Sequence, residues 1–260
     1  MEASGAGCVF ATVNELPITP PTPVLVIDSY RIRADTLGVR GHRAIVAIDD
    51  LLRNLAVEVV VDPCPGAVSS NHPAAGSVLA GCGFAPLPPS IVALRDSRAA
   101  DQVDGLLVAT GGADAAGFGY RIVDELRGVV GREVRIALAV GPHTPGARSV
   151  SADLVRRTDG LAPELLAADL VVTAGGVTLL EALCLGRPTV SLVLYDNQRR
   201  QVDGATRAGA TVEATLATVA HTVASLIARP NERGRLADAA AALVDGLGSA
   251  RIAEAIVGLA

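Results

Sequence analysis

A pair of glycines, followed by a hydroxyl and a carboxylate, stands between two apolar runs in the second half of the chain. Gly175 and Gly176 let a ligand approach the backbone closely, and a helix that begins after them offers free N–H groups and a positive dipole end to a phosphate. Thr178 adds a hydroxyl donor. Glu181 lies one turn into that helix, where its carboxylate can accept from the two hydroxyls of a ribose. The pattern favours a nucleotide site over the alternative, a tight turn followed by a surface glutamate.

A second glycine pair, Gly111 and Gly112, follows an earlier strand-like run and precedes Asp114. Ligands of open α/β sheets bind at the carboxyl ends of strands, so both glycine turns can face one crevice. Asp114 can contact the ligand there, or it can cap the next helix. Asn197 and Gln198 follow a further strand-like run, and their amides can bind a base edge or sugar hydroxyls.

The composition excludes several kinds of chemistry. The 260-residue chain has a net charge of −5, and all 22 of its basic residues are arginines. Without lysine there is no Schiff base and no phosphate-binding lysine of a P-loop, so we expect no cofactor. The arginines form no basic stripe, which argues against nucleic acid as a partner.

The spacing of cysteines and histidines predicts no metal site. The 4 cysteines form no Cys-x-x-Cys pair, and none of the 4 histidines has a cysteine or carboxylate neighbour at metal-ligand spacing. The N-terminus lacks the charged and then apolar pattern of a signal peptide. No apolar stretch reaches the ~18 residues of a membrane span. We therefore expect a cytoplasmic protein.

The elements that would position these residues alternate between strands and helices. After an irregular leader over residues 1–23, strands are predicted at Val24–Ser29, Ala44–Ile48, Val57–Val61, Val103–Ala109, Val134–Val140, Leu154–Val155, Leu170–Thr173 and Thr189–Leu194. Helices are predicted at Gly117–Val130, Leu161–Ala168, Val177–Leu185, from Asn197 onward, and at Leu216–Ala228, Glu232–Val244 and Arg251–Ala260. The alternation predicts an α/β fold with parallel strands, and the proline-rich stretch Pro63–Pro89 is expected to be a hinge region between two halves.

Several short motifs resemble those of a known family. They are Val24–Tyr30, Ile48–Asp50, Gly111–Asp114, Ala168–Leu183, Asp196–Gln198 and Asp245–Gly248. Together they look like the UDP-sugar hydrolases of the pseudaminic-acid pathway (PseG, with the related SpsG group). These hydrolases are in turn similar to the peptidoglycan N-acetylglucosaminyltransferase MurG and to GT-B folds generally. The resemblance covers the chain from about Val24 to the C-terminus.

The resemblance implies a GT-B-like fold of two Rossmann-like lobes with parallel sheets. We expect an abbreviated N-terminal lobe over residues 1–97, with a sheet of about three strands, and a C-terminal nucleotide-binding lobe over residues 98–260. The final helix would cross back onto the first lobe. By the same resemblance, both glycine pairs and Thr178 would surround the diphosphate, Glu181 would meet the ribose, and Asn197 and Gln198 would lie near the sugar.

The resemblance does not identify the catalytic group. Family members begin with a strand and a Gly-His loop whose histidine is the expected base, and this chain has no such opening. The Gly41–His42 pair follows the strand that ends at Asp28 and is not equivalent. Three candidates therefore remain: Asp28, Asp49 and His42. The two aspartates end adjacent predicted strands, where they could face the cleft or cap turns.

Three functions remain open. The first is a UDP-sugar hydrolase that releases UDP from an amino-sugar nucleotide, in a pseudaminic-acid-type or surface polysaccharide pathway. The second is a glycosyltransferase that uses a UDP-sugar donor. The third is a catalytically weak nucleotide-sugar-binding protein, a partner of another enzyme in a sugar pathway. The sequence has no basic-apolar patch of the kind that a membrane-lipid acceptor would need, which ranks the hydrolase and the binding protein above the transferase.

Overall fold

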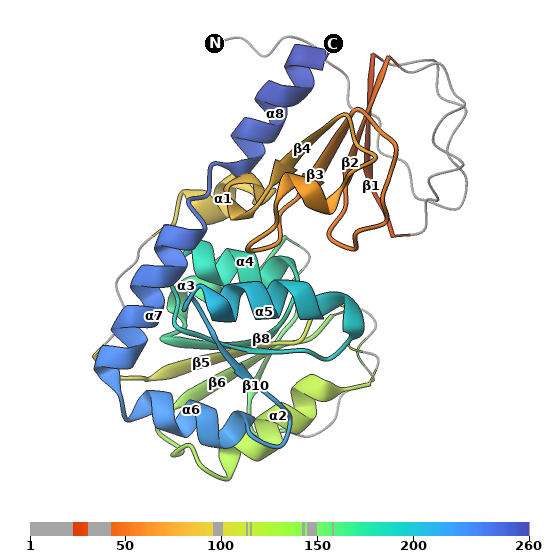
Figure 1. The fold of residues 1–260 in the computed structure, drawn as a ribbon. Helices are drawn as coiled ribbons and strands as arrows, with labels where there is room; N and C mark the ends of the chain where they lie inside the picture. Colours follow the sequence, from red (N-terminus) through yellow and green to blue (C-terminus); the bar gives the residue numbers. More distant parts are fainter. Residues whose placement is uncertain are drawn as a thin grey trace.

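Two separate parallel sheets form the framework of the protein (Figure 1). The computed structural model describes residues 23–30, 43–95, 101–112, 114, 116–141, 144, 150–157 and 159–259. In these residues the strand orders are β1-β2-β3-β4 and β10-β9-β8-β5-β6-β7. The predicted α/β fold with two parallel sheets is confirmed. The predicted division at residue 97 falls outside the described residues and stays a proposal.

The four-stranded sheet is built from short β-branched strands in the first third of the chain. The strands are β1 (Val24–Asp28), β2 (Ala44–Ile48), β3 (Val59–Asp62) and β4 (Ser77–Ala80). β3 is buried along its whole length, as a central strand covered on both faces should be. β1 and β3 end in Asp28 and Asp62, and Asp49 follows β2 directly, so carboxylates gather at one edge of this sheet.

The six-stranded sheet has helices on both faces. Its strands are β5 (Gly105–Ala109), β6 (Arg135–Ala139), β7 (Asp153–Val155), β8 (Leu170–Ala174), β9 (Thr189–Leu192) and β10 (Val212–Ala214). One face packs on α2 (Phe118–Arg127) and α6 (Val219–Ile227). The other face packs on α3 (Ala162–Ala167), α4 (Val177–Cys184), α5 (Arg199–Arg207) and α7 (Pro230–Leu243). Because both faces are covered, β5, β8 and β9 are buried throughout.

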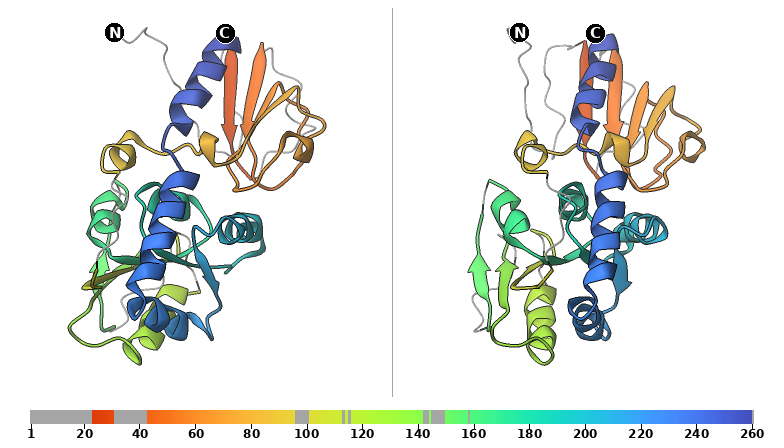
Figure 2. Two further views of the ribbon diagram at one scale, coloured as in Figure 1. Left: turned by 60° about the vertical axis from the view of Figure 1, so that its left-hand side comes forward. Right: turned by 90° about the vertical axis from the view of Figure 1, so that its left-hand side faces the viewer.

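The last helix, α8 (Gly248–Leu259), returns to the first sheet, as the resemblance implied (Figure 2). Its Ile252 packs in one cluster with Val46 and Val59. Arg251 Nη2 pairs with Asp245 Oδ2 at 2.7 Å, and Arg251 Nη1 donates to the carbonyl of Gly83 at 2.7 Å. The Asp-Gly-Leu-Gly motif therefore marks the junction between α7 and α8. We call the four-stranded sheet with α8 the first lobe, and the six-stranded sheet with its helices the second lobe.

Two strands were missed by the sequence prediction. β4 lies inside the stretch Pro63–Pro89 that was predicted to be a hinge, so that prediction and the estimate of about three strands were wrong. β4 forms because its four residues pair in parallel with β3, a partner that no local pattern reveals. β10 is a three-residue edge strand paired with β9. The remaining short helices are η2 (Ser69–Asn71), η3 (Cys82–Phe84), α1 (Pro89–Val92) and η4 (Asp196–Gln198).

Neither a membrane span nor a metal cluster is found among the residues that the structure describes. None of their helices is long and apolar enough to cross a bilayer. Their His, Cys, Asp and Glu side chains form no group of three or more that could hold a metal ion.

Candidate functional site

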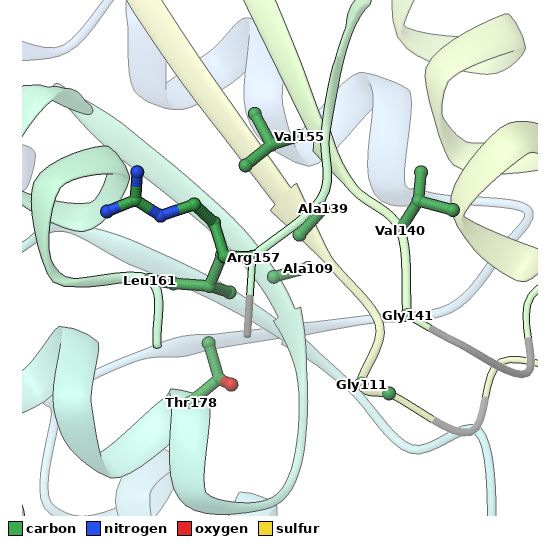
Figure 3. Close-up of a pocket in the computed structure, with 10 residues that line it drawn as sticks. Ala109, Gly111, Ala139, Val140, Gly141, Val155, Arg157, Leu161 and Thr178 are labelled. Atoms are coloured by element: carbon green, nitrogen blue, oxygen red, sulfur yellow. The ribbon is translucent and has the colours of Figure 1, made fainter. Parts of the chain in front are cut away.

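A pocket at the carboxyl ends of the second sheet is lined by the first glycine turn and by Thr178 of α4, whereas Gly175 and Gly176 do not line it (Figure 3). Gly111 and Gly112 follow β5, and Thr178 comes from the first turn of α4; together they line a cavity of about 130 Å³. The other lining residues are Ala109, Ala139, Val140, Gly141, Val155, Arg157 and Leu161. The pocket combines apolar walls with exposed glycine backbone and one hydroxyl, a surface suited to part of a nucleotide.

The start of α4 presents free backbone donors beside this pocket. Gly176, which precedes the helix, has φ = +145°, a conformation that side chains with a Cβ rarely adopt. Its N–H donates to Oε1 of Gln201 in α5. The N–H groups of Val177 and Thr178 have no acceptor among the described residues, as expected for the first positions of a helix. These two donors and the helix dipole can bind an anion.

Glu181 lies one turn further along α4 and does not line the pocket. Its side chain is half-buried, and burial raises the pKa of its carboxyl group. Within the described residues this carboxylate has no hydrogen-bond or ion-pair partner. Burying a carboxylate without a partner destabilises the fold, and such groups cluster at functional sites.

Asp114 serves the fold rather than the pocket. It is 3% exposed, and its Oδ2 accepts from the Thr110 hydroxyl at 2.7 Å and from the Gly119 N–H at 2.8 Å. Its Oδ1 accepts from the Phe118 N–H at 2.8 Å. Both oxygens are therefore occupied at the start of α2. We revise the predicted ligand contact accordingly and interpret Asp114 as the cap of α2.

Replacing Asp114 with alanine distinguishes a role in capping α2 from a role in binding the ligand. Asp114→Ala is expected to lower the free energy of unfolding by about 1–3 kcal/mol, because buried donors lose their acceptor, and to change the Kd of UDP by less than about twofold. Urea denaturation and calorimetry measure the two quantities. A folded Asp114→Ala protein that no longer binds UDP would show that Asp114 contacts the ligand.

Asn197 and Gln198 lie in η4, directly before α5. Oε1 of Gln198 accepts from the N–H groups of Leu194 at 2.9 Å and Tyr195 at 3.2 Å, so this side chain holds the loop after β9. Asn197 is exposed, and its amide can meet a sugar. Neither residue lines the pocket.

Two of the three catalytic candidates lie in the described residues, one of them exposed and the other buried. Asp28 ends β1 and is exposed. Asp49 has a fully buried side chain, and its two oxygens accept from Nε and the backbone N–H of Arg53, both at 2.8 Å. An aspartate held in this way cannot reach a substrate, so the prediction for Asp49 is corrected. His42 lies outside the described residues.

Asp50, the neighbour of Asp49, is the more accessible carboxylate. It is half-buried and accepts from the hydroxyl of Tyr30 at 3.2 Å. Burial raises the pKa of the Asp50 carboxyl, and the nearby Asp49 and Asp62 raise it further, against the opposing effect of the Tyr30 hydrogen bond. No pattern in the sequence singles out Asp50, because two adjacent aspartates after a strand give no signal about which one is buried.

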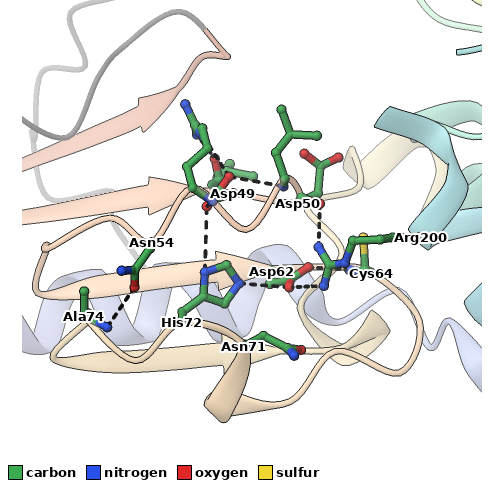
Figure 4. Close-up of polar contacts among 12 residues, drawn as sticks. Asp49, Asp50, Asn54, Asp62, Cys64, Asn71, His72, Ala74 and Arg200 are labelled. Atoms are coloured by element: carbon green, nitrogen blue, oxygen red, sulfur yellow. Dashed lines mark hydrogen bonds and ion pairs between the residues drawn. The ribbon is translucent and has the colours of Figure 1, made fainter. Parts of the chain in front are cut away.

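A buried polar cluster beside the first sheet was also missed (Figure 4). His72 Nε2 lies 2.9 Å from Asp62 Oδ2, and His72 Nδ1 lies 3.7 Å from Asp49 Oδ2; all three side chains have no exposed surface. Arg200, from α5 of the second lobe, places Nη2 2.8 Å from the same oxygen of Asp62. Asp62 and Arg200 are 138 positions apart, so no local spacing could have paired them.

Comparison with known proteins shows which known fold the chain shares. No protein-family model matches the chain. The UDP-N-acetylglucosamine–N-acetylmuramyl-(pentapeptide) pyrophosphoryl-undecaprenol N-acetylglucosamine transferase of Sorangium cellulosum is 37% identical over 113 residues. That match covers 39% of this chain and 28% of the relative, so it spans less than a third of the relative's length.

Solved structures cover most of the chain. The UDP-GlcNAc 2-epimerase from Neisseria meningitidis, bound to UDP-GlcNAc, aligns with a TM-score of 0.58 at 15% identity, over 83% of this chain and 70% of that one. The MurG of Acinetobacter baumannii aligns with a TM-score of 0.57 at 14% identity, over 86% of this chain and 76% of that one. Likeness at these identities concerns the fold. The chain has the GT-B fold, with two α/β lobes on parallel sheets and a last helix that returns to the first lobe.

Proposed function

We propose that the protein binds a UDP-sugar or a related nucleotide-sugar and transfers its sugar to an acceptor, with the nucleoside diphosphate as leaving group. The pocket that Gly111, Gly112 and Thr178 line, beside the start of α4, carries this proposal. The N–H groups of Val177 and Thr178 would hold the diphosphate, the apolar walls would hold the base, and Glu181 would accept from the ribose. Asn197 would lie toward the sugar.

The transferase is preferred over the hydrolase that the sequence ranked first. The curated relative is an N-acetylglucosamine transferase by name, and a MurG structure shares the fold, which supports the alternative that the sequence analysis kept open. Hydrolysis of the same donor differs only in the acceptor, which is water. A binding protein without turnover remains the third outcome, and the pathway stays open.

The proposed proton acceptor for either reaction is Asp50. Its raised pKa makes it a stronger base than an ordinary carboxylate, and general-base catalysis typically contributes about 10²–10⁴-fold to a rate. Asp28 is the second choice, because it is exposed at the same edge of the sheet.

Binding of UDP tests the site. We expect UDP to bind the parent protein and Thr178→Val to weaken its Kd by about 2- to 10-fold, because one phosphate hydrogen bond is lost. Thr222→Val is the matched control, since Thr222 is on α6 and its hydroxyl donates to the carbonyl of Thr218. Calorimetry with UDP, TDP, CDP and GDP also identifies the base. A parent protein that binds none of them contradicts the proposal.

The products distinguish the reactions. The parent protein is incubated with UDP-GlcNAc and a panel of sugar and lipid acceptors, and the mixture is analysed by mass spectrometry. A new glycoside together with UDP supports the transferase. Free sugar and UDP as the only products, independent of any acceptor, would favour the hydrolase instead.

A further inference from the structure

Helix α5 contacts the Gly175–Gly176 turn with one set of residues and the first lobe with another. Toward the turn, Oε1 of Gln201 accepts from the N–H of Gly176, and a Cβ on Gly175 would lie 3.1 Å from Cγ2 of Val202. Toward the first lobe, a Cβ on Gly204 would lie 2.1 Å from the carbonyl oxygen of Pro65. The backbone of α5 therefore touches the loop after β3 directly, and there is no room for a larger residue at Gly204.

Arg200 makes the polar contacts on the first-lobe side of α5. Its Nη2 pairs with Asp62 Oδ2 at 2.8 Å, and its Nη1 donates to the backbone carbonyl of Asp50. One guanidinium thus joins the end of β3 to Asp50, which lies two residues past the end of β2. Burial opposes the charge on Arg200, but the hydrogen bond to Asp62 and the nearby acidic groups, Asp62 and Asp50 among them, together outweigh it, and the pKa of Arg200 is raised.

The carboxylate that Arg200 contacts is itself fixed from the other side. Asp62 Oδ2 also meets His72 Nε2 at 2.9 Å, and Asp62 Oδ1 accepts from the N–H of Cys64 at 3.1 Å. His72 in turn faces Asp49, which is paired with Arg53. The cluster contains two carboxylates and two guanidinium groups, so each carboxylate has a guanidinium partner. Such a buried network is directional and resists a shift of either partner.

We propose that Arg200 is a positioning residue for the transfer reaction, which holds the carboxyl ends of β2 and β3 in register with the Gly175–Gly176 turn. A nucleotide-sugar bound to the second lobe must meet first-lobe groups such as Asp50 at a fixed distance, and small misplacements slow a reaction strongly. The role in the reaction rests on the proposed function. The mechanical link between the lobes does not, because it consists of contacts already described.

The neighbouring arginine supplies a matched control. Arg199 has 51% of its side chain exposed and pairs with Asp203 at 3.1 Å and Glu213 at 2.6 Å, all within the second lobe. Arg199→Gln therefore removes the same charge from the same helix without touching the first lobe. Arg200→Lys keeps the charge, but a single ammonium group cannot reproduce the two-pronged geometry.

Hydrogen exchange measured by mass spectrometry, with and without UDP, tests the link. In Arg200→Gln without nucleotide, peptides spanning residues 49–64 should exchange about tenfold faster than in the parent, while β5 and β8 stay unchanged. Arg200→Lys should fall between the two, and Arg199→Gln should match the parent. In the parent, UDP should slow exchange in residues 49–64 as well as at α4; in Arg200→Gln it should protect α4 alone, with its Kd within about twofold of the parent value.

The outcomes separate the link from the proposed function. Unchanged exchange of residues 49–64 in Arg200→Gln, faster exchange across both sheets, or equal protection of residues 49–64 by UDP in variant and parent overturns the positioning role. If UDP binds neither protein, the proposed function fails, and the comparison without nucleotide still decides whether Arg200 holds the lobes together.

Discussion

Asp62→Ala is expected to lower the free energy of unfolding by about 3–5 kcal/mol at pH 7, the largest effect of any substitution considered for this chain. The Asp62 side chain has no exposed surface and accepts from His72, Arg200 and the N–H of Cys64. Alanine would leave a guanidinium and an imidazole without their acceptor at the boundary between the lobes. Urea denaturation followed by circular dichroism measures the loss.

Asp203→Ala is the control for that measurement. Asp203 also pairs with an arginine of α5, but this pair is exposed, and exposed pairs typically contribute about 0–1 kcal/mol. If both variants lose less than about 1 kcal/mol, the Asp62 cluster is not the stabilising link that its burial indicates. If both lose several kcal/mol, a general effect on α5 is responsible.

Glu181→Gln is expected to have opposite effects on binding and on stability. A carboxylate that accepts from two ribose hydroxyls contributes about 1–3 kcal/mol, so the Kd of UDP should rise about 5- to 150-fold in the variant. Calorimetry at pH 7 measures the Kd of UDP for the variant and the parent. Glu254→Gln, an exposed substitution on α8, should leave the Kd unchanged.

The effect of Glu181→Gln on stability follows from the direction of its pKa shift. Burial raises the pKa of Glu181 in the folded protein, so the folded state prefers the neutral carboxyl. That preference stabilises the fold fully below the ordinary pKa of glutamate and is lost as the pH rises through the raised value. At pH 7 the ionised group destabilises the fold, and glutamine removes this effect.

Thermal unfolding as a function of pH checks the sign. The midpoint of Glu181→Gln should exceed that of the parent at pH 7, and the difference should shrink toward pH 4. A variant that binds UDP as tightly as the parent would remove Glu181 from the site, whatever its stability. A variant that is less stable at pH 7 would mean that Glu181 has a partner in the fold.

Most strands, most helices and the two glycine turns could be predicted from the sequence. Strands such as Ala44–Ile48 and Leu170–Ala174 are apolar runs interrupted only by Thr173, and this local property indicates burial wherever the partner strand lies. The turn at Gly175–Gly176 could be predicted for a similar reason, because a glycine pair between a strand and a helix is a local pattern.

The tertiary structure alone decided which polar residues are available to a ligand. Asp49 and Asp50 are adjacent in sequence, yet the buried carboxylate of Asp49 is paired with Arg53, whereas the carboxylate of Asp50 accepts from the hydroxyl of Tyr30. Asp114 was ambiguous until its oxygens were seen to accept from α2. β4, His72 and Arg200 owe their roles to partners distant in sequence, because pairing and charge neutralisation depend on what lies nearby in space, which a short segment does not encode.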